Sequence, residues 1–202
     1  MYYRILITPL LIFFLALSAN SIFAQDVSLK LQPDSEISIE GTSNVRDWDG
    51  DVQTIHAELI LDGFTAGEGI QNLTPDQFKK LTLRMPVESI DAGGRSLTNN
   101  MQKYLKKDDH PTITFELIRI TDVQESGNSV ILTADGVINA AGKDHGVTMQ
   151  VNAEINNQGT LVFSGTQALK MTDFDIDPPT AIFGTVRAVD EFNVHYSVKF
   201  NN

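Results

Sequence analysis

Apolar and polar residues alternate with a period of two over most of the chain after residue 25. The alternation is clearest in residues 191–200, whose apolar face carries Phe192, Val194, Tyr196, Val198 and Phe200. Residues 145–155 and 53–61 follow the same pattern. Because successive side chains of a β-strand point to opposite faces, the pattern predicts strands with one buried and one solvent-facing side.

Further strands are predicted at 27–32, 36–43, 81–90, 112–121, 129–139 and 160–170, which brings the total to about nine. Turn-forming residues such as those at 125–128 and 156–159 separate them.

Two segments have helical features instead. Thr74 followed by Pro75 predicts a short helix through Lys80. Residues 96–107 have apolar side chains at helical spacing and end in lysines, so they predict one amphipathic helix.

Strands with one apolar face, in a chain with little helix, must close into a barrel or stack as two sheets. An antiparallel barrel needs about eight strands before its interior can hold a small ligand. We therefore expect an all-β domain spanning residues 25–202, with one or two short helices. An antiparallel β-barrel is the preferred architecture, and a β-sandwich is the alternative.

Residues 1–24 have the layout of a secretory signal peptide. Arg4 is the only charged residue among the first 25, an apolar run follows from Ile5 to Leu17, and small residues precede Gln25. We expect cleavage after Ala24 and a periplasmic or otherwise extracytoplasmic mature protein. A membrane anchor is the alternative, but the apolar run is short for a span, which needs about 20 residues.

The charge balance and the residue types present exclude several classes of protein. The whole chain has 15 basic and 26 acidic residues and a net charge of −11. Without residues 1–24, which hold one base and no acid, 14 bases and 26 acids leave −12. Such an acidic chain is not expected to bind nucleic acid. The absence of cysteine excludes disulfides, thiolate metal sites and a cysteine nucleophile.

No motif predicts a catalytic or metal site. Asp47, Asp49 and Asp51 are spaced as in a calcium-binding loop, but Val52 stands where the sharp turn requires glycine. We read these acids, and those at 173–177, as loop residues without a metal. The four histidines are too far apart in sequence to form a metal-binding pair. We therefore expect a protein that is not an enzyme and needs no metal or cofactor.

Four ordered segments resemble the YceI-like family of exported lipid- or polyisoprenoid-binding proteins. They are Gly41–Trp48, the stretch from Met85 through Ser96-Leu97 and Tyr104-Leu105-Lys106 to Phe115, Gly136–Val151, and Lys170–Pro179 followed by Asp190-Glu191. Two positions depart from the family pattern. Arg46 stands where the family commonly has histidine, and Asp175 stands where glycine is frequent, so the turn there is expected to differ.

The resemblance implies an extended lipocalin-like antiparallel barrel of about eight to nine strands around an elongated apolar cavity for a polyisoprenoid or other long lipid chain. From the strand alternation we expect the cavity lining to include Ile39, Ile55, Leu59, Met85, Phe115, Leu117, Met149, Val151, Phe163, Phe192 and Tyr196. Arg46, Trp48 and Phe183 are expected near its mouth, where Arg46 could serve an anionic headgroup.

Two other functions compete with lipid binding. One is an interaction module with a filled core, and the other is a carbohydrate-active hydrolase on a β scaffold, since 26 acids always allow some carboxylate pair in space. A lipid carrier is expected to make transient membrane contact. The sequence leaves the lipid, its headgroup and the oligomeric state open, a dimer included.

Overall fold

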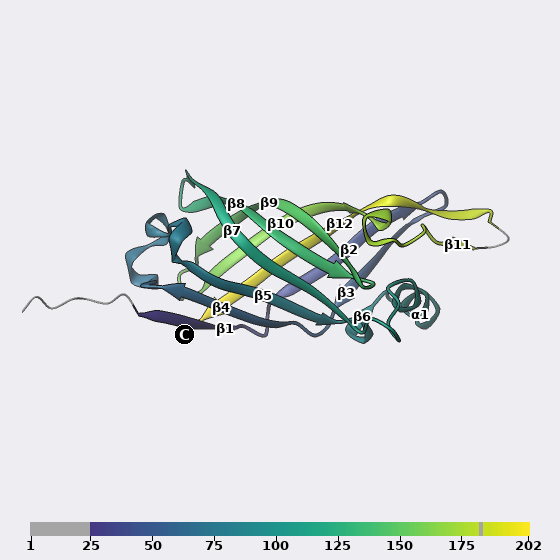
Figure 1. Cartoon of the computed structure of the whole chain (residues 1–202), viewed down its shortest axis with the longest axis horizontal. Coiled ribbons are helices and arrows are strands. Elements are labelled where there is room, and N and C mark those ends of the chain that lie inside the picture. Colours follow the sequence, from purple (N-terminus) through teal and green to yellow (C-terminus); the bar gives the residue numbers. More distant parts are fainter. Residues whose placement is uncertain (1–24, 182–183) are drawn as a thin grey trace, which may run out of the picture.

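The computed structural model describes residues 25–181 and 184–202. The predicted signal peptide and Phe183 lie outside the described residues. Antiparallel strands make up most of the chain (Figure 1). They are β1 (Asp26–Leu31), β2 (Glu36–Ser43), β3 (Asp47–Val52), β4 (His56–Asp62), β5 (Phe78–Pro86), β6 (Ile90–Asp91), β7 (Thr112–Ser126), β8 (Ser129–Ala140), β9 (Lys143–Ile155), β10 (Leu161–Lys170), β11 (Thr180–Ala181) and β12 (Val186–Asn201).

The strands close into an antiparallel barrel with eight positions around the ring, which confirms the predicted fold. β7, β8, β9, β10 and β12 each fill one position. The other three are each shared by two strands in line: β1 with β2, β4 with β3, and β5 with β6. β12 closes the ring, because its free edge pairs first with β2 and then with β1.

The three shared positions are interrupted at the same level of the barrel. The breaks fall at residues 32–35, 53–55 and 87–89, and the last of these is the short 3-10 helix η4 (Val87–Ser89). The strand predicted at 53–61 is therefore wrong at its start, because residues 53–55 lie in a break. Asp47, Asp49 and Asp51, predicted to lie in a loop, belong to β3 instead, where pairing with β2 keeps the backbone extended.

One α-helix, α1 (Arg95–Tyr104), confirms the amphipathic helix predicted from the spacing of apolar residues. The second predicted helix is limited to η3 (Pro75–Gln77), because β5 begins at Phe78 in register with Leu61. Other 3-10 turns are η1 (Ala66–Glu68), η2 (Ile70–Asn72) and η5 (Met171–Phe174). Within residues 25–181 and 184–202, no helix has the length and apolar character needed to cross a membrane.

The two ends of the barrel differ (Figure 1). The α1 end carries α1, the β2–β3 and β8–β9 turns and η5, while the far end carries η1–η3 and the β7–β8 and β9–β10 turns. Among the largest side chains that are almost wholly buried, most lie toward the far end: Leu59, Leu61, Val130, Leu132, Leu161 and Phe200. A packed apolar core therefore closes the far end.

Two inward-facing glycines let aromatic rings lie along the barrel wall. A Cβ on Gly136 of β8 would overlap the ring of Phe115 on β7, and a Cβ on Gly165 of β10 would overlap the phenol of Tyr196 on β12. Each ring occupies space that a side chain would otherwise take. The rings therefore project less into the barrel, and the centre stays open.

Tyr196 contributes a half-buried phenol to this wall. Its hydroxyl lies 3.5 Å from the carbonyl oxygen of Gln150, at the outer limit of a hydrogen bond. Burial raises the pKa of Tyr196 to about 12, because removal from water disfavours the charged phenolate. The side chain is therefore an uncharged part of the interior over the whole physiological pH range.

Truncating the far-end core should destabilise the barrel. We expect Leu59→Ala to lower the free energy of unfolding by about 2–5 kcal/mol, because Leu59 has no exposed surface and its removal leaves a cavity. Ile118→Ala, at a site that is 63% exposed, should change it by less than about 0.5 kcal/mol. Urea unfolding followed by circular dichroism measures both, and equal losses would contradict this description of the core.

Alkaline pH should destabilise the protein partly through Tyr196. Its folded-state pKa of about 12 exceeds an unfolded value of about 10. Its contribution is thus complete below pH 10 and is lost as pH rises toward 12. The free energy of unfolding of wild type should fall more steeply in this range than that of Tyr196→Phe. Parallel slopes, or a Tyr196 phenolate that appears near pH 10 in ultraviolet absorbance, would contradict the prediction.

Candidate functional site

The barrel contains an apolar cavity with a volume of about 160 Å³. Its lining comes from β2, β3, β5, β7, β8, β9, β10 and β12, together with the segments after α1 and at η5. Among the described residues that line it, every side chain is apolar except those of Thr114, Gln167 and Tyr196. Several lining side chains on β7 and β12 are only half-buried although they face inward, because they border open space rather than packed atoms.

Small inward-facing residues create this space. On β8, three inward positions are filled by small residues, namely Ala134, Gly136 and Ala140. On β10, Gly165 fills an inward position. An eight-stranded barrel is only just wide enough for ordinary side chains to fill it. Small side chains along one wall therefore leave open space in the interior. Leucines at the same positions would fill it.

Three phenylalanines form the floor of the cavity toward the far end. The ring centroids of Phe78 and Phe163 are 6.1 Å apart, and those of Phe163 and Phe200 are also 6.1 Å apart. Both pairs have the tilted or edge-on geometry that aromatic rings prefer. Phe163 and Phe200 are buried, so the floor is well packed.

Leu105, Phe174 and Ile176 bound the cavity at the α1 end. Phe174 belongs to η5, is 2% exposed, and makes an edge-on contact with the imidazole of His145, with centroids 5.6 Å apart. Asp175 follows in the left-handed conformation, with φ of 53°. Glycine adopts this conformation without steric cost, so it suits this position. Aspartate is one of the few other residues that also adopt it.

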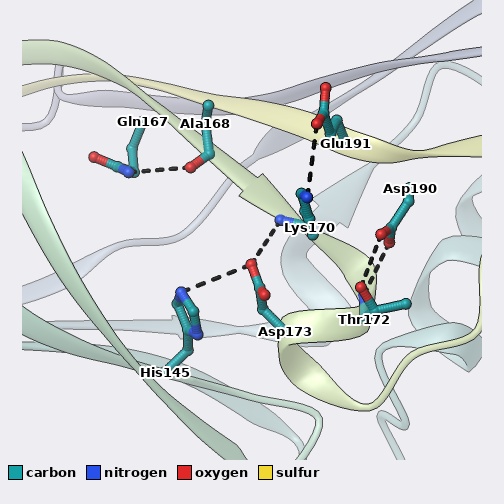
Figure 2. Close-up of polar contacts among 8 residues, drawn as sticks. All are labelled: His145, Gln167, Ala168, Lys170, Thr172, Asp173, Asp190 and Glu191. Carbon is teal, nitrogen blue, oxygen red and sulfur yellow. Dashed lines mark hydrogen bonds and ion pairs between the residues drawn. The ribbon is translucent and has the colours of Figure 1, made fainter.

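Polar contacts hold η5 over this end of the cavity (Figure 2). The Asp173 carboxylate accepts a 3.0 Å hydrogen bond from the backbone N–H of Lys170 and lies 3.7 Å from Nε2 of His145. The backbone N–H and hydroxyl of Thr172 both donate to Asp190, at 3.0 and 2.8 Å. Both hydrogen bonds lower the pKa of the Asp190 carboxyl group and keep it charged, and the bond from the backbone N–H has the larger effect.

Gln167 is a polar residue in the lining, and one N–H of its amide is already used within the wall. Nε2 donates to the carbonyl oxygen of Ala168 at 3.0 Å (Figure 2). No aspartate, glutamate or histidine among the described residues lines the cavity. In the same part of the chain, no three acidic or histidine side chains are grouped as a metal site would require. The interior therefore offers apolar surface and very few polar groups.

Nine of the eleven residues predicted to line a cavity do lie in its wall: Ile39, Met85, Phe115, Leu117, Met149, Val151, Phe163, Phe192 and Tyr196. Leu59 lies outside the lining, because it is packed within the far-end core. Ile55 also lies outside it, because it falls in the break between β3 and β4 and packs against the core from there. Whether these residues bind a ligand stays a prediction.

Of the predicted mouth residues, Phe183 lies outside the described residues, and neither Arg46 nor Trp48 belongs to the cavity lining. Arg46 lies in the β2–β3 turn, where its backbone forms hydrogen bonds with the hydroxyl of Ser43. The indole of Trp48 lies against Gly41 and donates from Nε1 to the carbonyl oxygen of Thr42 at 3.1 Å. These contacts hold both residues in the projecting β2–β3 hairpin.

Sequence reasoning missed the three side chains that bound the cavity at the α1 end. Leu105, Phe174 and Ile176 lie outside strands, so strand alternation gives no signal for them. Their apolar character inside otherwise polar segments was the only available sign.

A family model described as a YceI-like domain matches residues 30–200. Among solved structures, BcnA of Burkholderia cenocepacia is 18% identical with a TM-score of 0.58, and the match covers 84% of this chain and 99% of that one. A polyisoprenoid binding domain from Saccharophagus degradans is 11% identical with a TM-score of 0.61, covering 88% and 98%.

The YCEI protein of Campylobacter jejuni is 18% identical with a TM-score of 0.53, covering 76% of this chain and 84% of that one. No curated protein matches the sequence. At these identities the solved structures establish a shared fold. Since the family model spans nearly all of the barrel from β1 to β12, the chain belongs to the YceI-like family.

Proposed function

We propose that this protein binds a polyisoprenoid or another long apolar lipid chain in the barrel cavity, after export from the cytoplasm, and changes no covalent bond. The continuous apolar lining of the cavity carries this proposal. An apolar chain that enters such a space gains about 25 cal/mol for each Å² of apolar surface removed from water. The structural likeness to the polyisoprenoid binding domain from Saccharophagus degradans supports the same class of ligand.

The chemistry of the lining supports binding without catalysis. Tyr196 is the only titratable side chain among the described lining residues, and its pKa of about 12 keeps it protonated. General acid–base catalysis works best with a pKa near the operating pH. A lipid chain therefore meets no group in the wall that is poised to exchange a proton.

The cavity volume indicates that binding requires movement of the wall. A dry apolar cavity of roughly 150 Å³ accommodates a molecule the size of benzene, and the cavity here is about 160 Å³. A long chain needs more space than this. The side chains at the α1 end, Leu105, Phe174 and Ile176, lie outside the strand ladder and can move without breaking the pairing of the barrel. We propose that the chain enters at this end, during transient contact with a membrane.

A charge placed inside the cavity should abolish lipid binding. Leu117 faces the cavity and Ile118, its neighbour on β7, is 63% exposed. We expect Leu117→Arg to remove lipid that copurifies with the protein, because a guanidinium in an apolar wall is costly to desolvate. Ile118→Arg should retain it. Mass spectrometry of organic extracts of protein from its own host measures both.

A second variant separates loss of binding from loss of folding. Ala134→Phe adds an apolar ring to the wall at an inward position and should occupy the cavity while the barrel still folds. We expect it to contain little or no lipid and to keep the circular dichroism spectrum of the wild type. Stoichiometric lipid in folded samples of both Leu117→Arg and Ala134→Phe would refute the proposed site.

Export should remove residues 1–24. We expect protein from the extracytoplasmic fraction to begin at Gln25, because the small residue Ala24 follows a short apolar run. Intact mass and N-terminal sequencing measure this. A protein that keeps Met1 and stays with the membrane would support the anchor instead.

A further inference from the structure

A second hollow, of about 450 Å³, lies at the α1 end of the barrel outside the apolar cavity. Unlike the cavity, it is lined by polar side chains: Asn99, Gln102, Lys103, Lys106, Lys107, Asp108 and Asp109. Three lysines in one hollow are unusual here, because the chain from residue 25 has only 14 basic residues against 26 acidic ones. We refer to it as the lysine hollow.

The described contacts leave the charges of these lysines without a carboxylate partner. Among the described residues, no aspartate or glutamate oxygen lies within 4 Å of the ammonium groups of Lys103, Lys106 or Lys107. Asp108 and Asp109 line the same hollow but are exposed and form no ion pair with them. By contrast, Lys79 and Lys80 on the barrel wall pair with Asp62 and Glu58 at 3.0 and 2.7 Å.

Neutral oxygens hold two of the ammonium groups in place. Lys107 Nζ donates to Oε1 of Gln102 at 3.1 Å. Gln102 is itself 7% exposed and is fixed by donation from its Nε2 to the carbonyl oxygens of Glu88 and Ile90, each at 3.1 Å. A buried amide therefore orients Lys107 without neutralising it.

Lys106 connects the lysine hollow to the cavity. Its ammonium donates to the carbonyl oxygens of Ala141 in the β8–β9 turn and of Asp175 after η5, each at 3.4 Å. Asp175 lies between Phe174 and Ile176, and Leu105 directly precedes Lys106. All three of these apolar side chains bound the cavity. The hollow and the α1 end of the cavity therefore share one wall.

These lysines do more than neutralise the C-terminus of α1. Cations near a helix C-terminus interact favourably with its unpaired carbonyl groups. Here the Lys106 ammonium instead donates to the β8–β9 turn and to the segment after η5, and the Lys107 ammonium donates to the side chain of Gln102. The charge of Lys106 is thus directed to the region between α1 and the end of the cavity.

We infer that the lysine hollow binds an anionic group, a phosphate or a carboxylate, at the head of the lipid whose chain occupies the cavity. This inference rests on the proposed function. Lys103 and Lys107 would supply charge-assisted hydrogen bonds to the anion. Lys106 would place that anion next to Leu105 and Phe174, where the chain enters the cavity.

Two probes with the same apolar chain test the inference. Farnesyl phosphate and farnesol differ only in the phosphate, so the ratio of their dissociation constants isolates the headgroup. We expect the mature wild-type protein to bind farnesyl phosphate about tenfold more tightly than farnesol. Raising the salt concentration should reduce this ratio, because exposed charges are screened.

The variants Lys103→Gln and Lys107→Gln should each reduce the ratio, and together they should bring it close to one. Their affinity for farnesol should be that of the wild type. Lys30→Gln is the matched control, since Lys30 is an exposed lysine on β1 that does not line the lysine hollow and also forms no ion pair among the described residues. Isothermal titration calorimetry measures all of these constants.

Each result has a distinct meaning. Equal wild-type affinity for both probes, or a phosphate preference that survives in the double variant, overturns the headgroup site and leaves the proposed function standing. Failure of the wild type to bind either probe overturns both. If inorganic phosphate binds as tightly as farnesyl phosphate and displaces it, the hollow is a site for a free anion, and the lipid headgroup assignment is overturned.

Discussion

The hydrogen bonds of β12 are the interaction on which the rest of the structure depends. One edge of this strand pairs with β10 from Glu191 to Phe200, and the other pairs with β2 and then with β1. This second edge brings the two ends of the sheet together and so removes the free edges that an open sheet would expose. Once the ring is closed, alternate side chains of every strand face one enclosed space. Its apolar surface, and hence the cavity, follows from that closure.

The closed ring separates two kinds of chemistry. Inside, small residues on β8 and β10 and aromatic rings laid over glycines leave an apolar space. Outside, Lys79, Lys80, Arg119 and Lys199 each form an ion pair with a nearby acid. The α1 end combines the two, because apolar side chains bound the cavity there while lysines without carboxylate partners lie just beyond. A molecule with a long apolar tail and a charged head matches that arrangement.

Most of the barrel was predictable because regular strands carry a regular signal. The alternation at 191–200 and 145–155 corresponds to long unbroken strands, and residues such as Phe115, Val151 and Tyr196 could be assigned to the interior from their position in the pattern alone. The same reasoning misplaced Ile55 and Leu59. A local break removed Ile55 from the strand, and the position of Leu59 along the barrel axis, which a period of two does not encode, placed it in the far-end core.

Features outside the strands were beyond such reasoning. Lys103, Lys106 and Lys107 could be recognised as charges at the end of a helix, but not as the lining of a hollow, because that depends on where η5 and the β8–β9 turn fold back. The same holds for Phe174. In each case the relevant contact joins segments that are distant in sequence, and no local pattern records it.

The breaks at 32–35, 53–55 and 87–89 give the barrel unequal mechanical properties around its circumference. Backbone ladders resist stretching and shear. The strands β7, β8, β9, β10 and β12 each run without a break, but β9 and β10 pair only through Asn152–Ile155 and Leu161–Ser164, next to their turn. On the opposite side, three neighbouring positions lose ladder bonds at one level, where single bonds such as that from the N–H of Gln53 to the carbonyl oxygen of Ser89 cross the gap. The wall is therefore weakest along two lines, at these breaks and where β9 and β10 part beyond Ser164. A change in girth would concentrate there, and the breaks divide the part of the barrel next to α1 from the packed far end.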